Sequence, residues 1–277
     1  MSPRPILEIK DLRVSFLDPH NASQTIEAVK DANLALEEGA FTSIVGESGS
    51  GKSVTSLSIT RLTKPHQISG EILWRGGHHE KNLLALNEKE LLGIRGKEIA
   101  YVFQDPGSSL NPVLRVGPQI AETYRAHFDV DANQAQNRAL ELIAAVQMRD
   151  ANRVYQSYPH ELSGGMRQRA MIAMALIAEP KLLIADEPTT ALDSEVEKEI
   201  LRLLVKIKEE RKLTILFITH DMGHASAFSD RIYVMGKGEI AEKLERSAQG
   251  FLPKSEDAKK LFSASFWNVP AKSLLEI

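Results

Sequence analysis

Residues 46–53 read Gly46-Glu47-Ser48-Gly49-Ser50-Gly51-Lys52-Ser53 and fit the phosphate-binding pattern G-x-x-x-x-G-K-[ST] without a mismatch. Glycines allow backbone conformations that other residues avoid, so successive N–H groups can converge on the β- and γ-phosphate oxygens of a nucleotide. Lys52 would add a positive charge on those oxygens, and the Ser53 hydroxyl is placed to ligate Mg²⁺. The alternative for such a stretch is a linker rich in Gly and Ser.

The flanks of this loop favour nucleotide binding over a linker. Residues 40–45 have the pattern of a short buried strand, and residues 54–62 have helical spacing. A loop between them would lie at a helix N-terminus, whose dipole favours anions. The nucleotide contacts predicted in this stretch are Gly46, Glu47, Ser48, Gly49, Ser50, Gly51, Lys52, Ser53 and Val54.

The composition is that of a globular chain without a strong charge field. The 277 residues are 43% hydrophobic, and 34 basic and 37 acidic residues leave a formal net charge of −3. This balance argues against a nucleic-acid surface, so we expect no nucleic-acid partner. Zero cysteines exclude disulfides, thiolate zinc sites and iron–sulfur clusters in this chain and fit a reducing cytosol. The chain opens without an apolar signal segment, and no apolar run approaches the roughly 18 residues that span a bilayer. We therefore expect membrane association only through a partner.

The periodicity along the chain predicts an α/β fold. Strand patterns occupy residues 6–16, 25–36 (a second strand pair), 70–76, 98–104, 181–186, 213–219 and 231–235. Helical patterns occupy residues 132–148, with Leu140, Ile143 and Val146 on one face, and residues 162–178, 195–208 and 258–266. The β–α alternation predicts a P-loop nucleoside-triphosphatase core with a mostly parallel sheet and helices on both faces. The early strands are expected to form an antiparallel β subdomain, and residues from about 105 to 178 are expected to form a helical subdomain.

Two acidic residues follow the apolar strand pattern of residues 181–185. Asp186 stands where a P-loop ATPase holds Mg²⁺ through water. Glu187, directly after it, can reach the water that attacks the γ-phosphate, as general base or as its positioning group. The alternative is that both acids belong to an ordinary turn or a helix cap.

Residues 162–166 open a predicted helix with Ser163, Gly164 and Gly165. Such a start offers backbone N–H groups, a hydroxyl and a positive dipole end, and so a second phosphate-binding surface. One chain seldom needs two γ-phosphate sites, so we expect this surface to complete the site of a second subunit. The alternative is a plain N-cap with a flexible entry.

These motifs together resemble a known family. The loop at 46–53, Gln104, residues 162–166, Asp186 with Glu187, residues 191–193 and His220 occur in the order and approximate spacing of the Walker A, Q-loop, signature, Walker B, D-loop and H-loop motifs. The chain resembles the ATP-binding subunit of an ABC transporter over roughly residues 5 to 245. More narrowly, residues 45–55, 103–112, 162–175 and 185–193 resemble the oligopeptide/dipeptide/nickel importer branch.

The resemblance implies a role for each matching residue. Gln104 would contact Mg²⁺ or the attacking water and sense the membrane partner, and His220 would hold the γ-phosphate. Asp193 would meet the P-loop of a partner subunit, and Ser163 with Gly165 would close over the partner's ATP. Phe16 stands where an aromatic residue of the family stacks on adenine. Taken alone, Phe16 could be an ordinary strand core residue and His220 could cap a strand end.

The resemblance also implies cofactors, partners and a location. The cofactors would be ATP and Mg²⁺, and the partners would be transmembrane permease subunits, a second identical or homologous ATP-binding subunit and, indirectly, an extracytoplasmic substrate-binding protein. The chain would work peripherally on the cytoplasmic face of the inner (cell) membrane, with peptides or nickel as the imported substrate. A non-transport ABC ATPase acting on nucleic acid or ribosomes is the alternative, although such chains usually carry two tandem cassettes or a long coiled-coil insertion.

The chain departs from the branch near its C-terminus. Residues 1–245 are predicted to form the ABC ATP-binding domain, and residues 246–277 a C-terminal extension. Many ATPases of this branch carry a His-Pro-Tyr motif and clustered cysteines there, whereas this chain has Ser265-Phe266-Trp267-Asn268-Val269-Pro270. The extension is therefore predicted to be shortened or diverged. His78 and His79, in a predicted loop, are expected to be solvated rather than to bind a metal.

Overall fold

The computed structural model describes residues 4–190 and 192–264. The chain divides into two compact units, one formed by residues 1–91 and 214–277 and the other by residues 92–213. We call them the first and the second unit and describe each by itself. The division in sequence falls within α2 (Glu88–Leu92).

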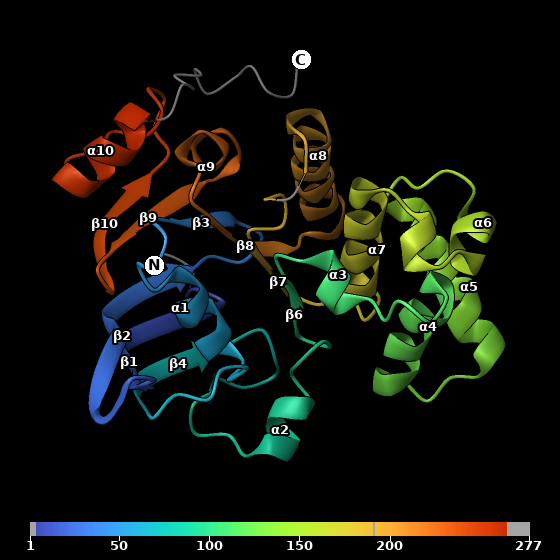
Figure 1. Cartoon of the computed structure of the whole chain (residues 1–277), viewed down its shortest axis with the longest axis horizontal. Coiled ribbons are helices and arrows are strands. Elements are labelled where there is room, and N and C mark those ends of the chain that lie inside the picture. The colour runs from blue at the N-terminus through green and yellow to red at the C-terminus, as the bar shows by residue number, and fades with distance from the viewer. Residues whose placement is uncertain (1–3, 191, 265–277) are drawn as a thin grey trace. The chain divides into compact units, whose positions relative to one another are not determined.

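The first unit contains a sheet in which parallel and antiparallel strands lie in the order β5-β4-β1-β2-β10-β9-β3-β8 (Figure 1). Its strands are β1 (Leu7–Asp18), β2 (Asn21–Leu36), β3 (Phe41–Val45), β4 (Gln67–Trp74), β5 (Lys81–Asn82), β8 (Thr214–Thr219), β9 (Arg231–Gly236) and β10 (Glu239–Glu245). The strand β3 pairs in parallel with β8 and with β9, and it is buried along its whole length. The strands β1, β2, β4 and β5 pair antiparallel. Both the parallel core and the antiparallel part expected from the sequence are present.

The helices of the first unit are α1 (Lys52–Ile59), α9 (Met222–Phe228) and α10 (Glu256–Ala264). One core cluster joins Val45 of β3 to Val234 of β9, Phe251 and the fully buried Ala258 of α10, with Leu261 packed against it. Phe251 and α10 therefore pack on the sheet, and a helix is present in the described part of the stretch predicted to be helical, residues 258–264. Residues 265 and 266 of the predicted helix lie outside the described residues.

The second unit combines a pair of parallel strands, β6 and β7, with a group of helices. Figure 1 shows α4, α5 and α6 gathered beside α7. Its elements are β6 (Ile99–Val102), α3 (Pro106–Ser109), α4 (Val116–His127), α5 (Ala132–Ala145), α6 (Ala151–Gln156), a 3₁₀ helix (Pro159–Glu161), α7 (Gly164–Leu176), β7 (Leu182–Asp186) and α8 (Ser194–Arg211). No helix of the described part of either unit is long and apolar enough to cross a membrane.

Two predictions of local structure need correction. Residues 25–36 belong to one long strand, β2, which pairs with β1 rather than forming a strand pair of its own. The helix predicted to end at residue 148 ends at Ala145, because Gln147 adopts a left-handed conformation with φ of 61°. The buried face of α5 is formed by Ala135, Ala139 and Leu142 with Ile143, whereas Leu140 is only half-buried. Small alanines allow neighbouring helices to approach this face closely, which a hydrophobicity pattern does not reveal.

Candidate nucleotide-binding site

The loop after β3 curls around its own lysine. Lys52 is 5% exposed, and its Nζ donates hydrogen bonds to the carbonyl oxygens of Gly46 at 2.8 Å and Glu47 at 2.9 Å. Gly51 has φ of 104°, in the left-handed region that favours glycine. A Cβ at Gly46 would lie 2.1 Å from the carbonyl oxygen of Met235, so only glycine fits the close approach to β9. A flexible linker would show none of these constraints.

The same loop suits a polyanionic ligand. The helix α1 begins at Lys52, and no side chain caps its N-terminus. Backbone N–H groups of the first helical turn, an adjacent buried cation and the exposed Ser53 form a donor set that fits phosphate oxygens. The Ser50 hydroxyl is buried without a hydrogen-bond partner among the described residues. The residues present therefore fit a nucleoside triphosphate, and Ser53 offers a hydroxyl ligand for Mg²⁺.

His220 lies at the same edge of the sheet as the loop. Val45 and Thr219 are register partners of the parallel strands β3 and β8, so His220 and Gly46 follow at the same level. The His220 side chain is exposed. The turn here is capped by Asp221, whose carboxylate accepts the backbone N–H of His224 at 3.0 Å and begins α9. Asp221 thus supplies the N-cap of α9.

Phe16 lies on β1 opposite Ile26 of β2. Its side chain is half-buried and does not belong to the core, while Ile26 is 50% exposed. Register partners present their side chains on the same face of a sheet, so the two form an exposed apolar surface. The interpretation of Phe16 as an ordinary core residue is not supported, and its stacking on adenine stays a prediction. His78 and His79 have exposed side chains.

In the second unit, Asp186 is the last residue of β7 and is 8% exposed. The Tyr101 hydroxyl on β6 donates a hydrogen bond to its Oδ2 at 2.8 Å. Tyr101 also packs against Phe103, with ring centroids 4.5 Å apart and ring planes tilted by 34°. Tyr101 holds the Asp186 carboxylate from the adjacent strand, and sequence reasoning missed it because β6 and β7 are far apart in the chain.

Glu187 has an unusual backbone conformation, with φ of 45°. Its Oε2 accepts hydrogen bonds from Gln104 Nε2 at 3.4 Å and from Thr190 Oγ1 at 3.0 Å. Left-handed backbone at a residue other than glycine costs free energy and concentrates at functional sites. Glu187 begins a turn, because its carbonyl oxygen accepts the backbone N–H of Thr190 at 3.4 Å, and the residue that caps the next helix, α8, is Asp193. Thr190 is a second contact that the sequence did not reveal.

Ser163 is the N-cap of α7, and its Oγ accepts the backbone N–H of Met166 at 3.3 Å. Ser163 therefore does cap α7, as the alternative interpretation expects. Its hydroxyl oxygen accepts the hydrogen bond from Met166, so its O–H group is still available to donate to a ligand. A Cβ on Gly165 would lie 2.5 Å from Cγ1 of Val196, whereas on Gly164 it would lie 3.3 Å from the Leu192 side chain. Helix packing thus requires glycine at position 165, independently of any ligand.

Asp193 caps α8 by accepting the backbone N–H groups of Glu195 at 3.2 Å and Val196 at 3.0 Å. The structure shows this local role, and the predicted contact of Asp193 with a partner subunit stays a prediction. Ala191, the first residue of the same motif, lies outside the described residues.

Comparison with known proteins decides the family. Residues 29–190 match the family model described as ABC transporter. The chain belongs to the ABC transporter family. It is 45% identical over 242 residues to the probable peptide ABC transporter ATP-binding protein y4tR of Sinorhizobium fredii, covering 86% of this chain and 70% of that protein. It is 46% identical over 240 residues to the oligopeptide transport ATP-binding protein OppD of Bacillus subtilis, covering 86% of this chain and 65% of that protein.

Solved structures agree with this assignment. The ABC cassette MJ0796, in a dimeric post-hydrolysis state bound to ADP and Pi, is 32% identical and has a TM-score of 0.75, with 86% of this chain and 98% of that chain covered. The protein cbiO1 from Clostridium perfringens, part of the ABC transporter complex cbiONQ, is 25% identical with a TM-score of 0.72, covering 95% and 92%. The present chain is an ATP-hydrolysing ABC cassette.

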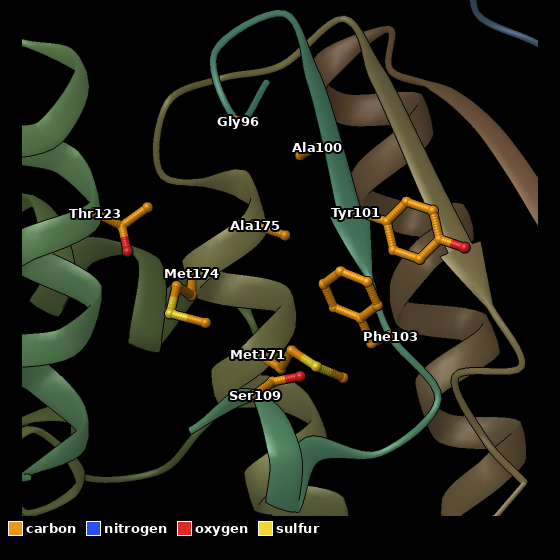
Figure 2. A pocket seen from close by; sticks show the side chains of 9 residues that line it. All are labelled: Gly96, Ala100, Tyr101, Phe103, Ser109, Thr123, Met171, Met174 and Ala175. Carbon is orange, nitrogen blue, oxygen red and sulfur yellow. The ribbon is translucent and has the colours of Figure 1, made fainter. Parts of the chain in front are cut away.

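The second unit of this ABC cassette also contains an apolar pocket of about 460 Å³ (Figure 2). Figure 2 shows Met171 and Met174 of α7 across from Tyr101 and Phe103 at the end of β6. Phe103 is 41% exposed, an unusual state for a phenylalanine, and it directly precedes Gln104. Methionine and aromatic side chains at an open pocket suit the docking of an apolar segment.

Proposed function

We propose that this ABC cassette powers the import of short peptides and works as one of a head-to-tail pair of cassettes attached to permease subunits at the cytoplasmic face of the membrane. The names of its relatives support peptides over nickel as the substrate. The single observation that carries the catalytic assignment is the position of Glu187, whose carboxylate is held by hydrogen bonds from Gln104 and Thr190 directly after the buried Asp186. No observation favours the alternative of a non-transport ATPase.

Each residue of the loop then has a defined task. Lys52 and the N–H groups at the start of α1 would bind the β- and γ-phosphates, and Ser53 would ligate Mg²⁺. Asp186 would hold Mg²⁺ through water, in the orientation that Tyr101 fixes. Mg²⁺, when bound, would neutralise charge on the phosphate oxygens.

The hydrolytic residues act on the attacking water. Glu187 would accept its proton as general base, and Gln104, bonded to Glu187 at 3.4 Å, would position the water or contact Mg²⁺. His220, at the level of the loop, would hold the γ-phosphate. Phe16 would stack on the adenine ring, which is consistent with its partial exposure.

The remaining motif residues would act on a second cassette. The Ser163 hydroxyl, with Gly164 and Gly165, would close over the ATP of the partner, and Asp193 would meet the partner's loop. Because ATP would then contact both cassettes, binding favours the closed dimer. Hydrolysis removes the γ-phosphate contacts and allows reopening.

We further propose that an apolar cytoplasmic segment of a permease subunit occupies the pocket beside Phe103. Phe103, which lines the pocket, directly precedes Gln104 in the sequence, and Gln104 donates a hydrogen bond to Glu187. Movement of a docked segment would therefore displace Phe103 and change the position of the hydrolytic residues. This gives a physical route from the permease to ATP hydrolysis.

The variant Glu187→Gln tests the catalytic assignment. It keeps the shape and the hydrogen-bond acceptor but removes the base, so turnover should fall at least about 100-fold while ATP binding persists. We expect ATP to trap the dimer, measured by size-exclusion chromatography, and Glu195→Gln, an exposed carboxylate of α8, to behave as wild type. Wild-type hydrolysis by Glu187→Gln would refute the role of base.

The variant Met174→Glu tests the docking proposal. A charge in the apolar pocket should prevent assembly with permease subunits, while the ATPase activity of the isolated cassette stays unchanged. Leu92→Glu, at a residue that is 62% exposed, is the control and should assemble normally. Subunits isolated from the native membrane and identified by mass spectrometry give the readout. Normal assembly of Met174→Glu with permease subunits would contradict this docking site. Stable association of the wild-type chain with nucleic acid or ribosomes instead of permeases would favour the non-transport alternative.

A further inference from the structure

The helix α10 brings a lysine to the phosphate-binding loop from the other end of the chain. Lys260 Nζ lies 2.7 Å from Glu47 Oε1, a pairing that spans 213 positions of sequence. Glu47 directly follows Gly46 and occupies the first of the four unspecified positions in the pattern G-x-x-x-x-G-K-[ST]. A pocket of about 280 Å³ adjoins this pair, and its lining includes Ser48, Ser50, Lys237 and Asp257.

The helix α10 is held in place by its packing and by hydrogen bonds before its first residue. Ala258 is fully buried in the core cluster that contains Val45, the last residue of the strand that leads into the loop. The Glu242 carboxylate accepts the backbone N–H groups of Lys254 at 3.0 Å and Ser255 at 2.8 Å, just before the helix begins. The helix is thus fixed at its start and along its buried face, which places Lys260 over the loop.

The ion pair between Lys260 and Glu47 affects the charge of the phosphate-binding loop. A carboxylate at Glu47 places a negative charge beside the site of a triphosphate, and like charges repel. The hydrogen bond and the charge of Lys260, assisted by the charge of Lys237, lower the pKa of Glu47, so this carboxylate is ionised and its negative charge is balanced by Lys260. The same pairing raises the pKa of Lys260.

We propose that Lys260 is a positioning residue of the nucleotide site, which neutralises Glu47 and so raises the affinity of the loop for the triphosphate. The inference rests on nucleotide binding by residues 46–53. Both side chains are largely exposed, 73% for Lys260 and 67% for Glu47, so the effect is modest and depends on salt. Lys260 acts through Glu47 and does not need to touch the nucleotide.

The test measures binding of a non-hydrolysable ATP analogue and of adenosine to the full chain by calorimetry. Lys260→Ala should weaken binding of the analogue about 3- to 5-fold at low salt, with little change for adenosine, which carries no phosphate. Lys260→Arg should restore wild-type affinity. The matched control is Lys259→Ala, since Lys259 lies on the same helix but pairs with Glu256 at 2.9 Å, and it should bind as wild type.

A double variant separates neutralisation of Glu47 from any direct contact. In the Glu47→Gln background no charge needs balancing, so adding Lys260→Ala should cause no further loss. Raising the salt from about 50 mM to about 500 mM should shrink the difference between wild type and Lys260→Ala, because the Debye length falls. Equal weakening by Lys259→Ala, unchanged affinity of Lys260→Ala, or a full loss in the Glu47→Gln background would overturn the proposal.

Lys52→Ala distinguishes failure of this inference from failure of the site itself. Loss of binding in Lys52→Ala together with normal binding in Lys260→Ala refutes only the role of Lys260. Retained binding in Lys52→Ala would refute the loop as the nucleotide site and the inference with it.

Discussion

Replacing Gly165 with alanine separates the packing role of this glycine from its proposed role toward a partner's ATP. The added Cβ would lie 2.5 Å from Cγ1 of Val196, closer than carbon atoms approach without displacement. Val196 is β-branched and helical, so its χ1 rotation is restricted and the clash must shift α7 against α8. Such overpacking costs about 1–3 kcal/mol, of which the better helix propensity of alanine offsets up to about 1 kcal/mol.

We therefore expect Gly165→Ala to lower the free energy of unfolding by about 1–2 kcal/mol, seen as a fall of about 2–8 °C in Tm. In the Val196→Ala background the clash is absent, so the same substitution should be neutral or slightly stabilising. Thermal unfolding of the four proteins of this cycle gives the coupling. Gly164→Ala is the control, because its Cβ would meet only the flexible end of Leu192 at 3.3 Å.

Equal destabilisation by Gly165→Ala in both backgrounds would refute the packing explanation. The ATPase activity of the double variant adds a second result. If stability returns but hydrolysis does not, Gly165 has a functional role besides packing, as the proposed closure over a partner's ATP requires.

Two further predictions concern contacts between distant parts of the sequence. The variant Tyr101→Phe removes a hydrogen-bond donor from the buried Asp186 carboxylate. It should lower the free energy of unfolding by about 1.5–3 kcal/mol, measured by thermal unfolding, and raise the KM for ATP with Mg²⁺. An unchanged stability and KM would contradict the orienting role of Tyr101. Burial by itself raises the pKa of Glu242. Hydrogen bonds from Ser255 and Lys254 lower the pKa by more than burial raises it, so the net pKa lies below the ordinary value of 4.5. Since the folded pKa is depressed, Glu242 stabilises the attachment of α10 above about pH 4.5, and this contribution is lost as the pH falls through the folded value. Glu242→Gln should remove this pH dependence from hydrogen exchange at Ser255 and speed that exchange at neutral pH; a wild-type profile would refute it.

Much of the fold and of the candidate site could be predicted from the sequence, because the evidence is local. Apolar runs indicate the strand that ends at Asp186 and the strand that ends just before His220, and the strand–loop–helix order around Gly46 indicates the phosphate loop. The order of short motifs was enough to indicate the ABC family. The end of α5 was mistaken because a turn at Gln147 competes with a helical pattern that continues past it.

The sequence by itself therefore determined the chemical groups of this ABC cassette and their order along the chain. Only the tertiary structure decided which distant residues hold those groups in place: Tyr101 against Asp186, Val196 against Gly165 and Lys260 against Glu47. Strand register and helix packing create these contacts between segments far apart in the chain. Periodicity reports which face of an element is apolar, but it carries no information about which neighbour that face meets.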